Sequence, residues 1–528
     1  MQRLQPSQAK GLLTEGGEIA FIDVREFGQY GEGHPFFAIN IPYSRLELDV
    51  SQLIPRHSVR ILLLDDNDGI AERAAARLGA LGYNHICILD GGAAAWASAG
   101  YTLFKGVNVP SKAFGELVEQ DMDTPYLTVE ALEAKRRSGE NLVLLDGRSP
   151  QEFQKMTIPG AQSCPNAELL HRLPVFADDP DTTIVVSCAG RTRSIIGAQS
   201  LRNLGLANSV FALKNGTQGW ILAGLKLERG SKPGELPALD AAALAVSSDR
   251  AADLASRFDI PRIDREVLTA WQDDSARTLY LFDVRSSNEY TAGHLPGASH
   301  APGGQLVQAT DHWVAVRGAR IVLSDDTGLR AANTALWLRA MGHDVYVLND
   351  NAGTCATSPK PAQAWVASKD LPVIAPDVLT AHLEAGAQLI DLSPGMEYRD
   401  RHIKGAAWAI RPALDNLELS KEAEIILVSL APGIAELVAI DLMEGGYTNV
   451  YRLDGKPDDW RSAGLSIVAS PDQPGDEDCI DYLFFVHSRH EDDLEACRRY
   501  LEWEINLLNQ VDAQEVGTLN PPREATLP

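Results

Sequence analysis

One cysteine stands where its neighbours could ionise it and make it a nucleophile. Cys188 follows the apolar run 184–187 and precedes Arg191 and Arg193, after which an amphipathic segment begins at Ser194. This pattern predicts a buried parallel strand, a short loop and a helix. Backbone N–H groups, the helix dipole and two guanidinium groups would favour the thiolate. We therefore expect Cys188 to react; the alternative is a small buried packing residue.

Three separate motifs around this cysteine resemble one known family. The loop Cys188-Ala189-Gly190-Arg191-Thr192-Arg193 resembles the active loop of the rhodaneses, sulfurtransferases that carry sulfane sulfur as a cysteine persulfide. Asp146-Gly147-Arg148 upstream, and Gly216, Trp220 and Gly224 downstream, fit the same pattern. The resemblance implies that Cys188 is catalytic. It also implies that the substrate-binding loop comprises Ala189, Gly190, Arg191, Thr192, Arg193 and Ser194.

The resemblance further implies a thiosulfate sulfurtransferase that works by a ping-pong reaction. The Cys188 thiolate would take the outer sulfur of a donor such as thiosulfate, while Arg191 and Arg193 stabilise the departing sulfite. Cyanide or a thiol would then collect the sulfur, and the reaction needs no cofactor and no metal. Only four residues separate Cys188 from Arg193. Related phosphatase loops have five, so a phosphatase or arsenate reductase is a more distant alternative.

Four segments of the chain repeat one plan of alternating strands and helices. In each copy an apolar strand ends in an aspartate, and these aspartates are Asp23, Asp146, Asp283 and Asp391. Forty-two residues separate Asp146 from Cys188, and the same interval leads from Asp23 to Asp65 and from Asp283 to Asp325; the fourth copy is four residues shorter. Glycines at 82, 205, 342 and 446 follow the next helix as expected C-caps. The pattern predicts four tandem rhodanese-like α/β domains, each a mostly parallel sheet with helices on both faces.

The domain limits follow from these repeats and from the composition of the segments between them. We expect an inactive domain over 1–118, the catalytic domain over 119–232, and inactive domains over 250–370 and 371–470. A C-terminal tail with an amphipathic helix would occupy 471–528. Linkers are expected at 105–122, 228–237 and 357–361, with Trp365 standing in for the tryptophan of the third repeat.

The three other loops lack a thiol and are expected to be catalytically silent. They read Asp65-Asp66-Asn67, Asp325-Asp326-Thr327 and Ser429-Leu430-Ala431. Carboxylates there would repel an anionic donor, and they are more typical of helix caps than of cation sites. Asp146 and Arg148 are expected to form a structural ion pair, because copies one and three keep it without a thiol. Cys164 is expected to be buried and unreactive.

The composition excludes several classes of partner. The 528-residue chain has a formal net charge of −25, which argues against nucleic acid and anionic membranes. An anionic donor would therefore need a local basic pocket. The N-terminus lacks a signal peptide, no apolar run is long enough to span a membrane, and the six cysteines are scattered, so we expect a cytoplasmic protein. Its partners would be a small-molecule sulfur donor and acceptor.

Two questions stay open from the sequence alone. The tail has an extended segment over 481–486 and a helix over 492–511, with Leu494, Cys497, Leu501, Ile505 and Leu508 on one face. This apolar face could dock on its own chain or form a homodimer. The second question is whether the chain is an enzyme with three silent copies, or a sulfur relay and scaffold whose silent copies dock partner proteins.

Overall fold

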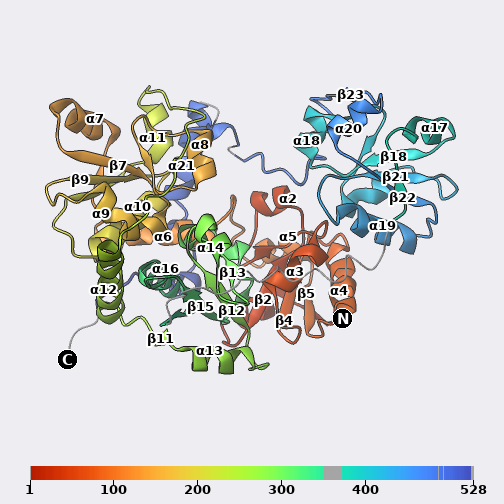
Figure 1. Cartoon of the computed structure of the whole chain (residues 1–528). Helices are drawn as coiled ribbons and strands as arrows, with labels where there is room; N and C mark the ends of the chain where they lie inside the picture. Colours follow the sequence, from red (N-terminus) through yellow and green to blue (C-terminus); the bar gives the residue numbers. More distant parts are fainter. Residues whose placement is uncertain (1, 350–370, 486, 491–492, 525–528) are drawn as a thin grey trace. The chain divides into compact units, whose positions relative to one another are not determined.

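The computed structural model describes residues 2–349, 371–485, 487–490 and 493–524 (Figure 1). The predictions for the linker at 357–361 and for Trp365 fall outside these ranges. Among the described residues, no helix has the length and apolar character that crossing a bilayer demands.

Four parallel sheets share one strand order, which confirms the predicted class of repeated α/β domains. The first runs β1-β5-β4-β2 with β3 paired to β2, and the second runs β6-β10-β9-β7-β8. The third and fourth run β11-β16-β15-β12-β13 and β17-β22-β21-β18-β20. The strands in these four orders run parallel, and the first sheet has one further strand, β14, which pairs with β2 antiparallel. Each connection between parallel neighbours must cross over the sheet, and helices supply these crossovers.

The first two repeats contain the following elements. Repeat one comprises β1 (Gln2–Leu4), α1 (Pro6–Leu12), β2 (Ile19–Asp23), α2 (Phe27–Glu32), β3 (Ile39–Asn40), α3 (Leu46–Leu53), β4 (Arg60–Leu64), α4 (Ile70–Ala80), β5 (Ile86–Leu89) and α5 (Gly92–Ser98). Repeat two comprises α6 (Val109–Met122), β6 (Tyr126–Leu127), α7 (Val129–Ser138), β7 (Leu142–Asp146), α8 (Pro150–Lys155), β8 (Gln162–Ser163), α9 (Asn166–Phe176), β9 (Thr183–Ser187), α10 (Thr192–Asn203), β10 (Val210–Leu213) and α11 (Gly216–Leu222).

The remaining elements follow in the same way. Repeat three comprises α12 (Ala241–Arg257), β11 (Arg262–Ile263), α13 (Arg265–Gln272), β12 (Leu279–Asp283), α14 (Ser287–Ala292), β13 (Ser299–His300), α15 (Gly303–Gln308), β14 (Val316–Arg317), β15 (Arg320–Ser324), α16 (Leu329–Ala340) and β16 (Asp344–Leu348). Repeat four comprises β17 (Val373–Ile374), α17 (Leu379–Glu384), β18 (Gln388–Asp391), α18 (Gly395–Asp400), β19 (His402–Ile403), β20 (Ala407–Trp408), β21 (Ile425–Val428), α19 (Ile434–Glu444), β22 (Val450–Leu453), α20 (Pro457–Ser462) and β23 (Ile467–Val468). The tail holds α21 (Leu494–Ile505) and α22 (Ala513–Val516).

The repeated sequence signals fall at equivalent places in the fold. Strands β2, β7, β12 and β18 all end at the predicted aspartate. The four glycines expected after the following helix have φ of 96, 70, 86 and 89°, the left-handed conformation that ends a helix without a steric penalty. In repeat two, apolar side chains from one face of the sheet form a core with Leu132 and Trp220.

The chain divides into two compact units that do not follow the order of the repeats. One unit gathers residues 1–10, 21–106 and 360–485, and so holds repeats one and four. The other gathers residues 11–20, 107–359 and 486–528, and holds repeats two and three together with the C-terminal tail. The Cys188 loop and α21 therefore belong to the same unit.

The segment 105–122, expected to be a linker, is mostly the helix α6. Its side chains Ala113, Phe114 and Val118 are fully buried, and it packs on α10. Close approach to Thr192 requires a glycine at position 115, because a Cβ there would lie 2.8 Å from Thr192 Cγ2. The expected domain limit at 118/119 thus cuts a helix that is part of the packing of repeat two.

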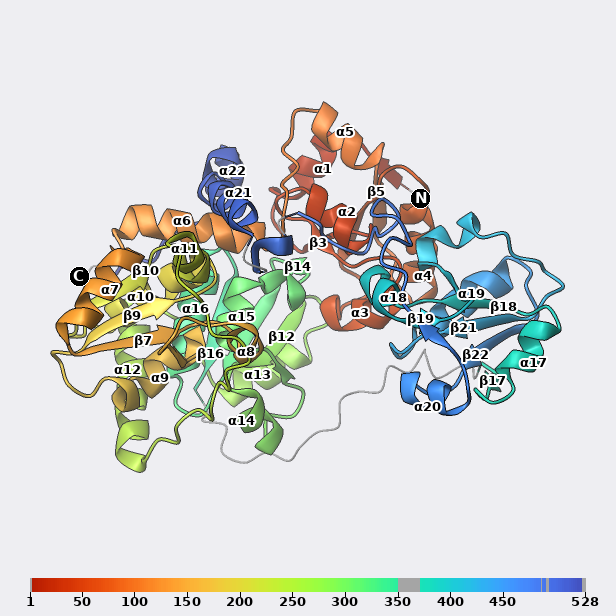
Figure 2. The same ribbon diagram turned by 90° about the horizontal axis from the view of Figure 1, so that it is seen from above.

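The tail also departs from its prediction. Residues 481–485 form no strand, and α21 ends at Ile505. Leu494 and Ile505 are 42% and 45% exposed, whereas the buried face is Ala496, Cys497, Tyr500, Leu501 and Glu504. Cys497 and Leu501 of the predicted apolar face are therefore on the buried face, whereas Leu494 and Ile505 are not, and Tyr500 and Glu504 lie there in addition. This face docks against α6 and α11 of its own chain, beside which Figure 2 shows α21.

Candidate active site

Cys188 lies directly after β9, in the loop that leads into α10. The strand–loop–helix arrangement is the one expected from the sequence, and Cys188 is a free thiol. Its Sγ lies 3.6 Å from Ser194 Oγ, which in turn donates to the carbonyl of Arg191 at 2.8 Å. Cys188 is only 2% exposed, so a substrate reaches this sulfur only after neighbouring groups move.

The backbone N–H groups at the start of helix α11 bind the carbonyl groups of the Cys188 loop. Thr217 N–H donates to the Cys188 carbonyl at 2.8 Å, and Gln218 N–H donates to the Ala189 carbonyl at 3.1 Å. Gly216, with φ of +50°, approaches so closely that a Cβ would lie 2.1 Å from the Cys188 carbonyl oxygen. The glycine of the third motif is thus needed to bring α11 against the loop.

Both arginines of the loop are paired with glutamates, whereas the sequence predicted that they would bind the anionic sulfur donor. Arg191 donates to Glu116 at 2.6 and 2.8 Å and also contacts Glu119. Arg193 makes a two-bond contact with Glu152, at 2.6 and 2.7 Å. Three carboxylates therefore surround two guanidinium groups, and the basic pocket expected for an anionic donor is not formed by the loop arginines.

The C-terminal helix supplies a further neighbour of the loop that sequence reasoning missed. Thr192 Oγ1 donates to Glu504 Oε1 at 2.8 Å across 312 residues of sequence. Glu504 and Tyr500 are 2% and 7% exposed, and both face Gly190. A buried glutamate cannot be recognised from the periodic spacing of apolar residues. The sequence therefore predicts that α21 packs against another surface, but not that Glu504 contacts the loop.

The surroundings of Cys188 shift its pKa in the direction opposite to the one predicted from the sequence. Burial raises the pKa of the thiol; Arg193 and Ser194 lower it, Glu504 raises it again, and the net direction is upward. The expectation of a thiolate favoured at neutral pH is wrong for this arrangement. The main cause is the burial of the thiol, to which the charge of Glu504 on α21 adds.

Because the pKa of Cys188 is raised above its ordinary value of 9.0, we expect its alkylation by iodoacetamide to accelerate with pH throughout the range 7 to 9. The thiolate fraction grows as pH rises, so no plateau should appear below pH 9. The measurement is the rate of alkylation at Cys188, followed by peptide mass spectrometry. A plateau reached below pH 8 would show instead that the loop ionises the thiol.

Asp146 and Arg148 form a buried fork beside the active strand. Arg148 Nε and Nη2 donate to the two carboxylate oxygens of Asp146 at 2.9 and 2.7 Å, and Thr157 Oγ1 adds a bond of 3.0 Å. The same fork recurs between Arg25 and Asp23 and between Arg285 and Asp283, where no thiol follows. Its contacts are internal to each repeat and place it in the framework.

In copies one and three an aspartate side chain accepts hydrogen bonds from the loop N–H groups. Asp65 accepts from the N–H groups of Asn67 and Ala71 at 2.9 and 3.0 Å. Asp325 accepts from Arg330 and Ala331 at 2.8 and 3.2 Å and also from Gly328. The carboxylate thus fills the position of the cysteine sulfur and caps the following helix, as expected of an acidic residue there.

The remaining candidate groups are structural. His34, His294 and His402 each stack on a tyrosine four residues earlier, with ring centroids 3.8 to 3.9 Å apart. Cys164 is completely buried, and burial raises its pKa well above the ordinary value. These groups take no part in the environment of Cys188.

One acidic group of described residues could suggest a metal site. His171, Glu289 and Asp326 bring ligand atoms within 4.8 Å of one another. Arg330 donates to Glu289 and Asp326 at 2.8 and 2.6 Å, and Arg172 donates to Glu289 at 2.9 Å. The carboxylates are therefore neutralised by guanidinium groups, and the cluster is an ion-pair network.

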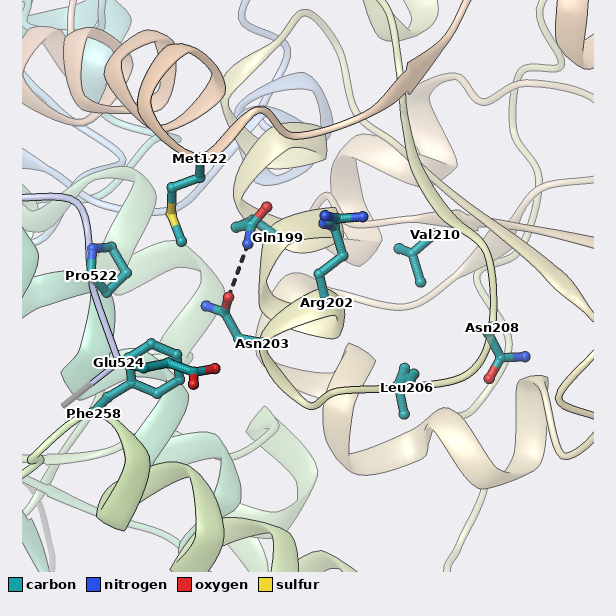
Figure 3. A pocket seen from close by; sticks show the side chains of 10 residues that line it. All are labelled: Met122, Gln199, Arg202, Asn203, Leu206, Asn208, Val210, Phe258, Pro522 and Glu524. Atoms are coloured by element: carbon teal, nitrogen blue, oxygen red, sulfur yellow. Dashed lines mark hydrogen bonds between the residues drawn. The ribbon is translucent and has the colours of Figure 1, made fainter. Parts of the chain in front are cut away.

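A cavity of about 410 Å³ lies in the same unit but away from the chemistry (Figure 3). It is lined by Gln199, Arg202 and Asn203 of the last turns of α10, together with Phe258 and Pro522. Cys188 stands before the first turn of that 12-residue helix, and a helix of this length spans roughly 18 Å. The cavity is therefore no entrance to the thiol.

The chain belongs to the rhodanese-like family. The rhodanese-like domain matches residues 5–99, 128–223 and 264–350, which correspond to the first three sheets. The fourth sheet lies outside these matches although its strand order is the same. No match was found among curated protein sequences.

One solved structure supports this assignment over nearly the whole chain. A thiosulfate sulfurtransferase from Pseudomonas aeruginosa is 40% identical, with a TM-score of 0.88, over 98% of this chain and 99% of that one. The Alr3790 protein from Anabaena sp. is 26% identical over 19% of this chain and 91% of its own, with a TM-score of 0.19. The first of these likenesses extends over all four repeats and the tail.

Proposed function

We propose that the protein is a sulfurtransferase that carries sulfane sulfur as a persulfide on Cys188. The observation that carries the proposal is the position of this thiol at the junction of β9 and α10, in the one described loop that has a sulfur where copies one and three have a carboxylate. Membership of the rhodanese-like family and the thiosulfate sulfurtransferase neighbour support the same reaction class.

The proposed half-reactions balance without a cofactor. The Cys188 thiolate attacks the outer sulfur of thiosulfate; the new S–S bond forms as the old one breaks, and sulfite leaves with the electron pair. An acceptor thiolate or cyanide then attacks the outer sulfur of the persulfide, and the electron pair returns to Sγ. A reducing cytoplasm would keep Cys188 as a thiol between turnovers.

Incubation with thiosulfate should add the mass of one sulfur atom to Cys188 and to no other residue. Intact-mass analysis followed by peptide mapping measures this addition, and subsequent cyanide should remove it with release of thiocyanate. Polysulfide serves as a second donor, because thiosulfate itself could be a poor one. A Cys188 that stays unmodified with both donors contradicts the proposed function.

A sulfur relay is the second candidate, favoured by the burial of Cys188 beneath α21. In that case a partner protein would uncover the thiol and deliver or collect the sulfur, and the silent copies would bind partners. Steady turnover with thiosulfate and cyanide alone distinguishes the enzyme from the relay.

A further inference from the structure

Three side chains converge on Gly190, in the middle of the Cys188 loop. A Cβ at this position would lie 2.6 Å from Glu504 Oε2, 3.1 Å from Tyr500 Cε1 and 3.6 Å from Gln218 Nε2. Two of these side chains come from α21 and one from α11, so the tail builds one wall over the loop. Any molecule that reaches the Cys188 sulfur past this wall meets these groups.

Two of the three side chains carry buried polar atoms that have no hydrogen-bond partner in the described part of the chain. Glu504 Oε2 has none, although Oε1 accepts from Thr192. Both polar atoms of Gln218, which is completely buried, also lack one. Burying such groups unpaired costs about 1–3 kcal/mol each, so they are poised to bind a group that donates hydrogen bonds.

The charges around the loop leave Glu504 as the group that a substrate would meet. Glu116, Glu119 and Glu152 are already paired with Arg191 and Arg193. Glu504 Oε1 accepts a hydrogen bond from the Thr192 hydroxyl, and no hydrogen bond to Glu504 Oε2 is found among the described residues.

Cationic groups also lie near this wall: the Arg489 guanidinium lies over the Tyr500 ring at 4.2 Å from its centroid, Glu504 acts on the charge of Arg191, and Lys112 of α6 lies close by. Its Nζ donates to the Val107 carbonyl at 2.6 Å and lies over the rings of Trp503 and Tyr500, at 4.5 and 5.4 Å from their centroids. Burial lowers the pKa of Lys112 to about 7, so it compensates the charge of Glu504 only in part at neutral pH.

We propose that Glu504 and Gln218 determine the acceptor specificity of the Cys188 site, by selecting thiols that carry a neighbouring ammonium group over anionic thiols. The inference rests on the proposed persulfide. The acceptor's thiolate attacks the outer sulfur, a new S–S bond forms, the bond to Sγ breaks and its electron pair returns to Cys188. The ammonium group donates to Glu504 Oε2 during this step, whereas a carboxylate in its place is repelled.

The test compares three acceptors of similar size and different charge: cysteamine, 2-mercaptoethanol and mercaptoacetate. Cys188 is first loaded with polysulfide, excess donor is removed, and the decay of the persulfide is followed by intact mass at equal concentrations of acceptor thiolate. We expect cysteamine to be at least about tenfold faster than mercaptoacetate, with 2-mercaptoethanol between them, because one charge in a poorly solvated site changes a rate by roughly this factor. In Glu504→Gln the ratio should fall to about 1–3.

The matched control is Glu502→Gln, which removes the same charge from the exposed side of the same helix. It should leave the order of the acceptors unchanged. The inference is overturned if the wild type shows no charge order, or if Glu502→Gln and Glu504→Gln shift it equally. Gln218→Leu keeps the volume and removes the amide, so it tests the pair if Glu504→Gln fails to fold. Failure to load Cys188 at all would contradict the proposed function, and so is distinct from these outcomes.

Discussion

The Cys188→Ser variant should lose sulfur transfer from thiosulfate to cyanide by a factor of at least about 10³. Serine has nearly the same size and can keep the contact with Ser194, so the loop should retain its conformation. Its hydroxyl, however, is far less acidic than a thiol and forms no persulfide. The measurement is the rate of thiocyanate formation, together with intact mass after incubation with the donor.

The control for this variant is Cys87→Ser, which changes a half-buried cysteine of repeat one. It should transfer sulfur at the wild-type rate. Residual activity in Cys188→Ser comparable with that of Cys87→Ser would mean that another sulfur does the chemistry. A loss in both variants would point to a general effect on folding, which the circular dichroism spectrum of each protein checks.

The second large effect concerns stability. Arg330→Met should lower the free energy of unfolding of the unit that holds repeats two and three by about 3–5 kcal/mol. Arg330 is completely buried and bonds Glu168 of repeat two at 2.9 Å as well as Asp326 and Glu289 of repeat three. Its loss removes the cation beside the buried carboxylate of Asp325 and leaves Glu168 with Arg172 as its remaining partner. Unfolding in urea, monitored by hydrogen exchange of the amide groups of β9 and α9, measures the change in this free energy.

Arg320→Met is the matched control, since it removes the same charge from the same repeat. Arg320 pairs with Asp274, whose side chain is 31% exposed, so this change should cost less than about 1 kcal/mol. Equal losses from the two variants would show that the buried network does not hold repeats two and three together. If repeat three of the Arg330→Met variant unfolds at a lower urea concentration while repeat two is unchanged, then the bond between Arg330 and Glu168 does not stabilise repeat two.

The framework of this protein could be predicted from its sequence because it depends on local and periodic signals. Apolar strands that end in aspartate, and glycines that end the following helices, recur at fixed intervals and locate all four sheets. The position of Cys188 between strand and helix follows from the same signals. The sequence also shows that the other loops lack a thiol. It does not show that Asp65 and Asp325 accept hydrogen bonds from the N–H groups of their loops.

The electrostatics of the site could not be predicted, because they depend on residues distant in sequence. Glu116 and Glu119 lie in a segment that resembled a linker, and Glu504 lies on a helix whose contact face is shifted from its apolar stripe. Two arginines beside a cysteine therefore suggested a basic pocket. In the folded chain, carboxylates from three other helices pair with these arginines or contact Thr192.

The contact between Thr192 and Glu504 also bears on how the protein is made. A ribosome adds about 5–20 residues each second, so the 312 residues between these two require roughly 15–60 s. During that interval repeat two can fold, yet α21, which places Glu504 and Tyr500 against the Cys188 loop, has not been synthesised. The nascent chain therefore presents this loop without the two side chains, and only the late synthesis of α21 adds them.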